Sequence, residues 1–199
     1  MSDRPIPRLG RRAFLASTAA AACATAAPSW AQQGSDIFAE EDTEIVQRNI
    51  AGFRAHRWQS HFDTLRGGAI LVDTKVRSLH YWSEDETVFK IYPTSVPLSP
   101  ELTRLGRTEV TQKVEGPSWR PTPSMIERNP EWPPFVPPGP DNPMGTHAMH
   151  LSWRYYRIHG THDVRKIGRQ SSNGCIGLYN EDIQELFALS NVGTQVLLI

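Results

Sequence analysis

Cysteine is scarce in this sequence: Cys23 and Cys175 are the only two among 199 residues. Cys23 falls in an alanine-rich N-terminal stretch that is expected to be removed, so Cys175 is the expected single thiol of the mature protein. A single cysteine cannot close an intramolecular disulfide, which excludes a small disulfide-bonded scaffold. Cys175 is therefore the partner in an intermolecular disulfide, a buried inert thiol or a reactive nucleophile.

An excess of charge of one sign is also lacking, with 21 Lys and Arg against 21 Asp and Glu. Without residues 1–31, the chain keeps 17 basic and 20 acidic residues, a net charge of −3 with neutral histidines. Strong nucleic-acid binding needs clustered cations that neutralise phosphates, so we expect no nucleic-acid partner. The remaining 168 residues are enough for one domain with its own hydrophobic core.

Residues 1–31 have the order of an export signal peptide. A basic start precedes an alanine-rich apolar stretch, and Ser29 and Ala31 provide the small residues of a cleavage site. The sequence Arg11-Arg12-Ala-Phe-Leu resembles a twin-arginine signal, whose substrates are exported already folded. A membrane anchor is the alternative, but the apolar stretch is shorter than the roughly 20 residues of a spanning helix. We predict export to the periplasm, with no membrane span in the mature protein.

Short apolar segments after residue 66 predict a mainly β domain with one or two helices. Residues 32–66 are mixed and polar and are the predicted N-terminal extension, with a short helix near residues 41–52. Asn180 is the expected N-cap of the one clear helix, which ends before Gly193. The expected strands, each apolar or alternating, are 69–73, 78–83, 87–92, 108–114, 148–153, 155–159 and 194–199.

Residues 117–143 form a proline-rich segment that holds 10 of the 16 prolines. Proline cannot donate a hydrogen bond to a sheet, so this segment is expected to be a loop. Its Trp119, Trp132 and Phe135 indicate a packed loop rather than a disordered linker. Two interpretations remain open: a rigid surface loop, or a wall or lid over an active site.

The residues around Cys175 favour the nucleophile interpretation. A thiol is activated by a neighbouring base, and His159 lies 16 positions upstream at the end of an expected strand. Gly160 frees the turn that follows His159, and a backbone carbonyl there could hold the imidazole in one tautomer. Gly174 allows close backbone approach, and consecutive N–H groups in such a turn could stabilise an oxyanion. None of these residues is specific by itself.

In combination, these motifs resemble the L,D-transpeptidase catalytic domain, the YkuD family. The resemblance covers residues 67–199, the expected catalytic domain. The motifs that carry it are Ile70-Leu-Val-Asp73, Pro117-x-Trp119-x-Pro121-Thr-Pro, Gly139-Pro-Asp-Asn-Pro-Met-Gly145, His159-Gly-Thr, Ile167-Gly168, Ser172-x-Gly-Cys-Ile, Asn180-x-Asp182 and Val192-Gly-Thr-x-Val.

The resemblance implies a β-sandwich-like mixed fold and a peptidoglycan enzyme that needs no cofactor and no metal. Cys175 would attack the diaminopimelate carbonyl of a donor stem peptide and form a thioester, with His159 as the base. A side-chain amine of an acceptor stem would resolve it, making a 3,3 or a 1,3 cross-link. The partners are therefore peptidoglycan stem peptides. The residues expected to form or support the oxyanion hole are Gly174, Gly160, Ser172 and Asn173.

The sequence departs from the family pattern at two positions. Many members have His before Gly-Cys, where this chain has Asn173, an amide that cannot titrate. An arginine commonly stands two residues after the cysteine, and here that residue is Gly177. Because arginine suits a carboxylate, its loss puts the usual donor recognition in question. The basic loop residues Arg165, Lys166 and Arg169 are candidates to compensate. The candidate substrate-binding residues are Arg165, Arg169 and Tyr156.

Three other functions stay open. Two histidine pairs, His147-x-x-His150 and His159-x-x-His162, accompany Cys175, but odd spacing on a strand sends the two members to opposite faces, which disfavours a shared metal. A peptidoglycan-binding module without turnover is a second alternative, which the intact His159 and Cys175 disfavour. An L,D-carboxypeptidase, in which water resolves the same thioester, is the third.

Overall fold

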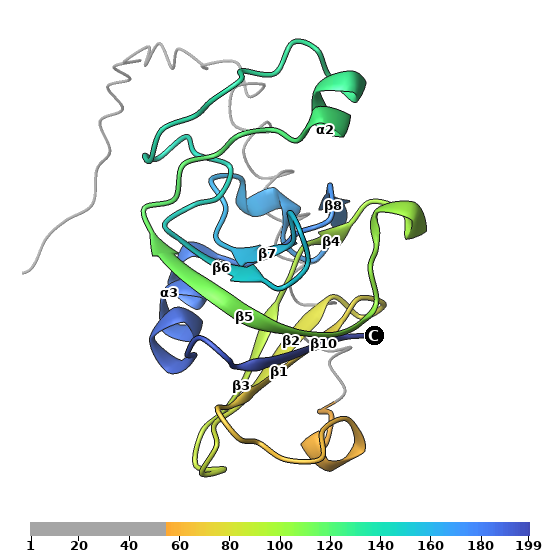
Figure 1. The fold of residues 1–199 in the computed structure, drawn as a ribbon, viewed down its shortest axis with the longest axis vertical. Coiled ribbons are helices and arrows are strands. Elements are labelled where there is room, and N and C mark those ends of the chain that lie inside the picture. The colour runs from red at the N-terminus through yellow and green to blue at the C-terminus, as the bar shows by residue number, and fades with distance from the viewer. Residues whose placement is uncertain (1–54) are drawn as a thin grey trace, which may run out of the picture.

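The computed structural model describes residues 55–199, which contain ten strands and two α-helices (Figure 1). The predicted signal peptide and the helix near residues 41–52 lie outside the described residues. The strands are β1 (Ala69–Asp73), β2 (Ser78–Trp82), β3 (Phe89–Pro93), β4 (Val96–Pro97), β5 (Gly106–Glu115), β6 (His147–Leu151), β7 (Arg157–His159), β8 (Gln170–Ser172), β9 (Ile176–Gly177) and β10 (Gln195–Leu198). The helices are α2 (Pro123–Arg128) and α3 (Asn180–Leu189), and short 3-10 turns occupy Trp58–Ser60, Pro100–Leu102 and Val164–Lys166.

Eight strands form one mixed, curled sheet in the order β3-β2-β1-β10-β5-β6-β7-β9, while β4 and β8 pair separately. The long strand β5 joins its two halves. Its first residues pair with β10 and its later residues pair with β6, with a register shift between Val110 and Gln112. Such irregularities bend and twist a strand. In Figure 1, β1 to β3 and β10 lie at one end of the molecule and β6 and β7 lie toward the other.

The predicted mainly β fold and its meander of β1, β2 and β3 are confirmed. All residues of β1 and β2 are buried because both faces of these strands are covered. Alternate residues such as Ile70 pack in the main core, which also includes Ile183 of α3. Those on the other face, such as Leu71, pack with Phe62 and Leu65 from the segment before β1. The described part of the N-terminal extension therefore seals one face of the sheet.

Several predicted boundaries are wrong by one or two residues, and two of them matter for the site. The strand predicted to start at Tyr155 starts at Arg157, because Tyr155 has a left-handed backbone (φ 68°) that ends the preceding turn. The predicted N-cap of α3, Asn180, is its first helical residue, and Tyr179 is the N-cap, without a side-chain capping bond. The Asn180 side chain serves another purpose: its Oδ1 accepts a hydrogen bond from the Thr146 N–H at 3.2 Å.

The proline-rich segment is folded rather than irregular, and it contains helix α2, which we did not predict. Thr122 caps this helix by accepting a hydrogen bond from the Met125 N–H at 3.3 Å, and Pro123 suits the first turn because it needs no N–H partner there. Trp119 pairs with Val136 through a β-bridge, which makes the segment a hairpin-like arm. The Trp119 and Trp132 rings pack edge to face, 5.7 Å between centroids.

Asn142 fixes the base of this arm. Its buried side chain donates from Nδ2 to the carbonyls of Pro117 at 3.0 Å, Val136 at 3.2 Å and Pro137 at 2.8 Å. Its Oδ1 accepts from the Met144 N–H at 2.8 Å. The Val136 carbonyl also accepts from the Trp119 N–H, and the Asn142 amide gives the two proline carbonyls a hydrogen-bond partner. The arm is thereby held in one position relative to β6, which starts soon after it.

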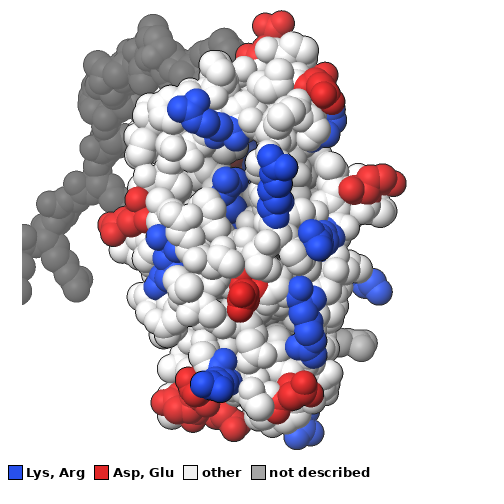
Figure 2. Space-filling model, viewed as in Figure 1, with Lys and Arg blue, Asp and Glu red and all other residues white. Residues whose placement is uncertain are grey.

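The charged side chains on the face shown in Figure 2 are distributed unevenly. Lys and Arg are spread over its middle, and most Asp and Glu lie toward its edges and ends. Among the helices within residues 55–199, none combines the length and the apolar character required to cross a membrane.

Candidate active site

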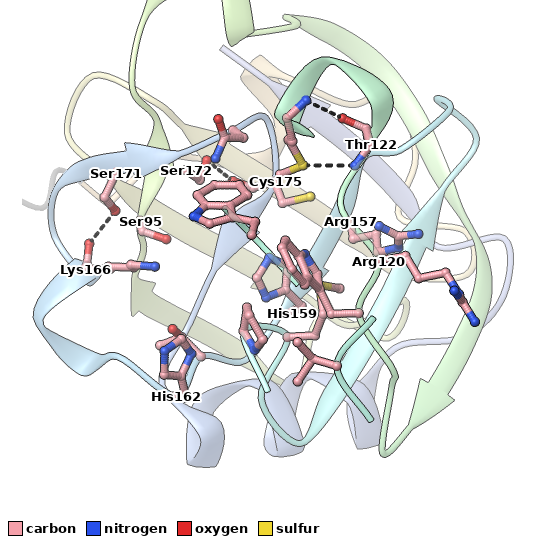
Figure 3. Close-up of a pocket in the computed structure, with 18 of the residues that line it drawn as sticks. Ser95, Arg120, Thr122, Arg157, His159, His162, Lys166, Ser171, Ser172 and Cys175 are labelled. Atoms are coloured by element: carbon pink, nitrogen blue, oxygen red, sulfur yellow. Dashed lines mark hydrogen bonds between the residues drawn. The ribbon is translucent and has the colours of Figure 1, made fainter. Parts of the chain in front are cut away.

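Strands β7 and β9 place three polar side chains on one face of the sheet. They run parallel, with Ile158 opposite Ile176. Both isoleucines are fully buried in the core, so their neighbours along each strand point to the opposite face. Arg157 and His159 flank Ile158, and Cys175 precedes Ile176. These three side chains therefore line one cavity (Figure 3).

Tyr155 orients the thiol through its backbone. Its left-handed conformation is rare for a residue with a bulky side chain, and such strain persists only where the surrounding structure imposes it. The Tyr155 carbonyl accepts the hydrogen bond of the Cys175 Sγ at 3.4 Å. Its exposed ring also lines the cavity. The strained residue therefore lies in direct contact with the candidate nucleophile.

The loop before Cys175 is fixed by Ser172. The Ser172 hydroxyl donates to the Cys175 carbonyl at 2.5 Å, and the Gly174 N–H points toward Ser172 Oγ at the longer distance of 3.4 Å. Gly174 has a φ of 131°, which side chains rarely adopt, and its Cα faces the ring of Tyr156. Glycine is therefore favoured here by its backbone conformation, since a Cβ would make only ordinary contacts with Leu102 and Tyr156. This loop sets the direction of the backbone N–H groups beside the thiol.

His159 is held in one tautomer by the next residue. Its Nδ1 lies 2.5 Å from the Gly160 carbonyl, which can only accept, so Nδ1 carries the proton. Nε2 is then the unprotonated nitrogen, as a general base requires. A side chain at Gly160 would collide with Asn180 Oδ1 and approach Ile183 to 3.1 Å. The close fit of α3 thus fixes the turn that orients the imidazole.

Burial keeps both members of this pair neutral at rest. It lowers the pKa of His159 to about 4, with smaller contributions from the positive charges of Arg157 and Lys166, against which the Gly160 bond acts. Burial also raises the pKa of the Cys175 thiol, and the charge and hydrogen bonds of Arg157 partly offset this rise. A neutral thiol beside a neutral imidazole is suited to proton transfer during attack rather than to a standing thiolate.

The cavity above these residues has a volume of about 380 Å³, within the range of small-ligand sites. The proline-rich arm forms one wall, through Trp119, Met125 and Trp132 among others, which favours the wall interpretation. The arm also contacts the nucleophile loop, because Arg128 of α2 donates to Asn173 Oδ1 at 3.0 Å. Asn173 therefore links the wall to the loop that carries Cys175.

The candidate substrate-binding residues lie outside this cavity. Arg165 is exposed and forms a two-point ion pair with Asp163, at 2.8 and 3.1 Å, and Arg169 is exposed elsewhere on the same loop. Tyr156 donates its hydroxyl to the Leu102 carbonyl at 2.9 Å and packs against Gly174, so it supports the loop from behind. Lys166 does line the cavity.

Sequence reasoning missed Arg157, Tyr155 and Ser95, all of which line the cavity. Arg157 carried a usable signal, because it stands two positions before His159 on a strand and so shares its face. Figure 3 shows Arg120 and Arg157 on one side of Cys175 and His159, and Lys166 and His162 on the other. The sequence held no signal for Ser95, which is distant along the chain.

Ser95 explains why position 177 holds glycine. Ser95 and Gly177 exchange two backbone hydrogen bonds, at 2.8 and 3.1 Å. Gly177 is buried, and a Cβ there would collide with the Ser95 hydroxyl. A side chain at position 177 would thus require the Ser95 hydroxyl to rotate away.

Of the two histidine pairs considered as metal ligands, His159 and His162 both line the cavity, whereas the members of the other pair have separate partners. His147 is buried, lies 3.0 Å from the Thr146 hydroxyl through Nδ1 and packs its ring against Phe187, whereas His150 lies 3.4 Å from Arg157 Nε. Within residues 55–199, no three His, Cys, Asp or Glu side chains are arranged as metal ligands.

Comparison with known proteins places this geometry in a family. The family model described as the L,D-transpeptidase catalytic domain (YkuD) matches residues 67–198. The protein named "Putative L,D-transpeptidase in ATP synthase subunits region ORF 5" from Fuscovulum blasticum is 52% identical over 199 residues, all of both chains. "Probable L,D-transpeptidase ErfK/SrfK" from Escherichia coli K12 is 40% identical over 142 residues, which cover 69% of this chain and 45% of that protein.

Solved structures agree in fold at much lower identity. L,D-transpeptidase 3 from Mycobacterium tuberculosis superposes with a TM-score of 0.56 at 16% identity, over 67% of this chain and 61% of that one. An L,D-transpeptidase from Stackebrandtia nassauensis gives 0.55 at 16% identity, over 79% and 66%. The family match, the close relative and the shared fold lead to one conclusion: this chain belongs to the L,D-transpeptidase catalytic domain family.

Proposed function

We propose that this protein is a cysteine-dependent peptidoglycan L,D-transpeptidase, with Cys175 as nucleophile and His159 as general base. The observation that carries the proposal is the shared face of β7 and β9. It brings the single thiol within residues 55–199 and an imidazole of fixed tautomer into one cavity. The substrates would be peptidoglycan stem peptides, and the enzyme would act after export to the periplasm.

The first half-reaction forms a thioester. As the sulfur of Cys175 attacks the diaminopimelate carbonyl, its proton passes to Nε2 of His159. Backbone N–H groups of Gly174 and Cys175 would stabilise the oxyanion of the tetrahedral intermediate. The intermediate collapses when the C–N bond to D-alanine breaks, and the leaving amine takes the proton from His159.

The second half-reaction repeats these steps in reverse with a new amine. A side-chain amine of an acceptor stem attacks the thioester and gives its proton to His159, and the sulfur leaves and is reprotonated. The aromatic wall of the proline-rich arm narrows the cavity around the acyl group, which would exclude water from the thioester. We therefore favour transfer to an amine over hydrolysis, with a 3,3 cross-link as the main product.

Incubation of the pure mature enzyme with tetrapeptide stems tests this function. We expect free D-alanine and a cross-linked dimer, whose linkage tandem mass spectrometry assigns as 3,3. A 1,3-linked dimer would show a different donor, and tripeptide without dimer would show a carboxypeptidase. Neither product, in the presence of a reactive Cys175, would contradict the proposed function.

The rate of Cys175 acylation should depend on pH through His159. Protonated His159 cannot accept the thiol proton, so the rate is lost as pH falls through its pKa of about 4. We expect the rate to hold from neutral pH down to about pH 5 and to fall about tenfold per unit below the pKa. Single-turnover acylation by freshly dissolved meropenem, followed by intact-protein mass spectrometry, measures this. An acid midpoint near the ordinary imidazole value of about 6.5 would contradict the buried, neutral base.

A further inference from the structure

Arg157 brings a guanidinium to the cavity from strand β7, whereas the arginine of the family pattern would stand on strand β9. The pattern expects arginine on β9, at position 177, where this chain has a buried glycine packed against the Ser95 hydroxyl. Arg157 lies on the adjacent strand β7 and points from the same face of the sheet. The cavity therefore keeps an arginine near the nucleophile, although the motif around Cys175 has none.

Arg157 interacts with two neutral groups, the Cys175 thiol and the His150 imidazole, so its charge remains available to an anionic ligand. It is half-buried, and its Nε faces Nε2 of His150 on β6 at 3.4 Å, a neutral acceptor that steadies the side chain. Burial, together with the charge of Arg157, lowers the pKa of His150 and keeps this partner uncharged. Among the ion pairs within residues 55–199, none includes Arg157. A half-buried guanidinium without a carboxylate partner favours an anionic ligand.

We propose that Arg157 binds the terminal carboxylate of the donor stem peptide while Cys175 attacks the adjacent carbonyl. This inference rests on the proposed function. In the attack geometry the carbonyl carbon lies roughly 3–3.5 Å from the sulfur. The terminal carboxylate is separated from that carbonyl only by the N and Cα of D-alanine, so it must lie close to the thiol. The diaminopimelate side-chain carboxylate lies at the far end of a flexible chain and has no such constraint.

Two donors that differ only at this carboxylate test the proposal. One is the tetrapeptide stem with a free terminal carboxylate, and the other ends in D-alaninamide. For the wild type we expect kcat/KM for release of the terminal residue to favour the acid by roughly 10- to 100-fold, the value of a charged hydrogen bond. Arg157→Gln should bring the ratio of kcat/KM for the acid to kcat/KM for the amide close to one. A smaller loss common to both donors is expected as well, because Arg157 also influences the pKa of Cys175 and of His159. Arg157→Lys should retain part of the preference.

Matched variants separate recognition from structural effects. Arg66→Gln removes an exposed arginine outside the cavity and should keep the wild-type ratio between the donors. Equal losses with both donors in Arg157→Gln and Arg157→Lys would overturn the proposal, because they would show that Arg157 acts through the thiol, the base or the fold. An unchanged preference for the acid would overturn it as well.

Alkylation of Cys175 tests the anion site without any stem peptide. Iodoacetate is anionic and iodoacetamide is neutral, and both report the same thiol. We expect Arg157→Gln to lower the ratio of the iodoacetate rate to the iodoacetamide rate by several-fold, because a nearby cation attracts only the anionic reagent. If the ratio falls but no stem peptide reacts, the proposed function fails while the anion site stands. If stem peptides react, but Arg157→Gln changes neither the iodoacetate-to-iodoacetamide ratio nor the preference for the acid donor, the inference about Arg157 fails and the proposed function stands.

Discussion

Replacing Cys175 by alanine is expected to abolish the release of D-alanine from a tetrapeptide stem, with a loss of at least about 10⁴-fold. The reason is chemical: without the sulfur there is no thioester, and the remaining binding groups cannot cleave an amide at a useful rate. Mass spectrometry of the products measures the loss. In cells that lack the chromosomal copy, the alanine variant should also fail to restore the cross-links that the wild type restores.

The fold should survive this change, so that the loss can be assigned to chemistry. Cys175 is half-buried, and the hydrogen bond of its thiol to Tyr155 is long, at 3.4 Å. We expect the melting temperature of Cys175→Ala to stay within a few degrees of the wild type. A variant that melts normally and retains more than about a hundredth of the activity would show that Cys175 is not the nucleophile.

Replacing His159 by glutamine is expected to slow the acylation of Cys175 by roughly 10²- to 10⁴-fold at neutral pH, the usual contribution of a general base. Because burial raises the pKa of Cys175, only a small fraction of the thiol ionises by itself at that pH. The measurement is single-turnover labelling by a carbapenem, followed by mass spectrometry. Equal labelling of the variant and the wild type would exclude His159 as the base.

The pH dependence of this variant provides its control. Without a base, only the spontaneously formed thiolate reacts, and below the thiol pKa its fraction rises tenfold per pH unit. The residual rate of His159→Gln should therefore climb steadily with pH, whereas the wild-type rate is level above about pH 5. A residual rate that stays level with pH would contradict a rate limited by thiolate formation and would point to damage at the site instead.

Local patterns predicted most of the strands because alternation and apolar runs depend on neighbouring residues alone. The segments at β1, β2 and β10 matched closely, since each is short and rich in aliphatic or aromatic residues. The short strands β4, β8 and β9 were not predicted, because two or three residues carry too little periodicity. Helix α2 was hidden by the surrounding prolines, although Thr122 and Pro123 form a recognisable helix start.

The candidate active site was likewise predicted only in part from the sequence. The thiol, the imidazole and the glycines beside them could be named from the sequence, because their chemistry and spacing are local. The cations of the cavity were predicted only in part. Lys166 was named and lines the cavity, whereas Arg165 pairs with Asp163 and neither it nor Arg169 lines the cavity. Arg120 and Arg157 also line the cavity and were not named, although Arg157 stands two positions before His159 on a strand.

By itself, the sequence determined which residues carry the chemistry we propose for this protein: the single thiol outside the predicted signal peptide, a histidine at a strand end and the glycines beside them. Only the tertiary structure decided what surrounds them. The parallel pairing of β7 with β9 put Arg157 beside the thiol. Ser95, from a segment distant along the chain, packs its hydroxyl against Gly177. Asn142 fixed the proline-rich arm as a wall of the cavity. These contacts join residues far apart along the chain, and they form only when the whole sheet has paired and buried its core.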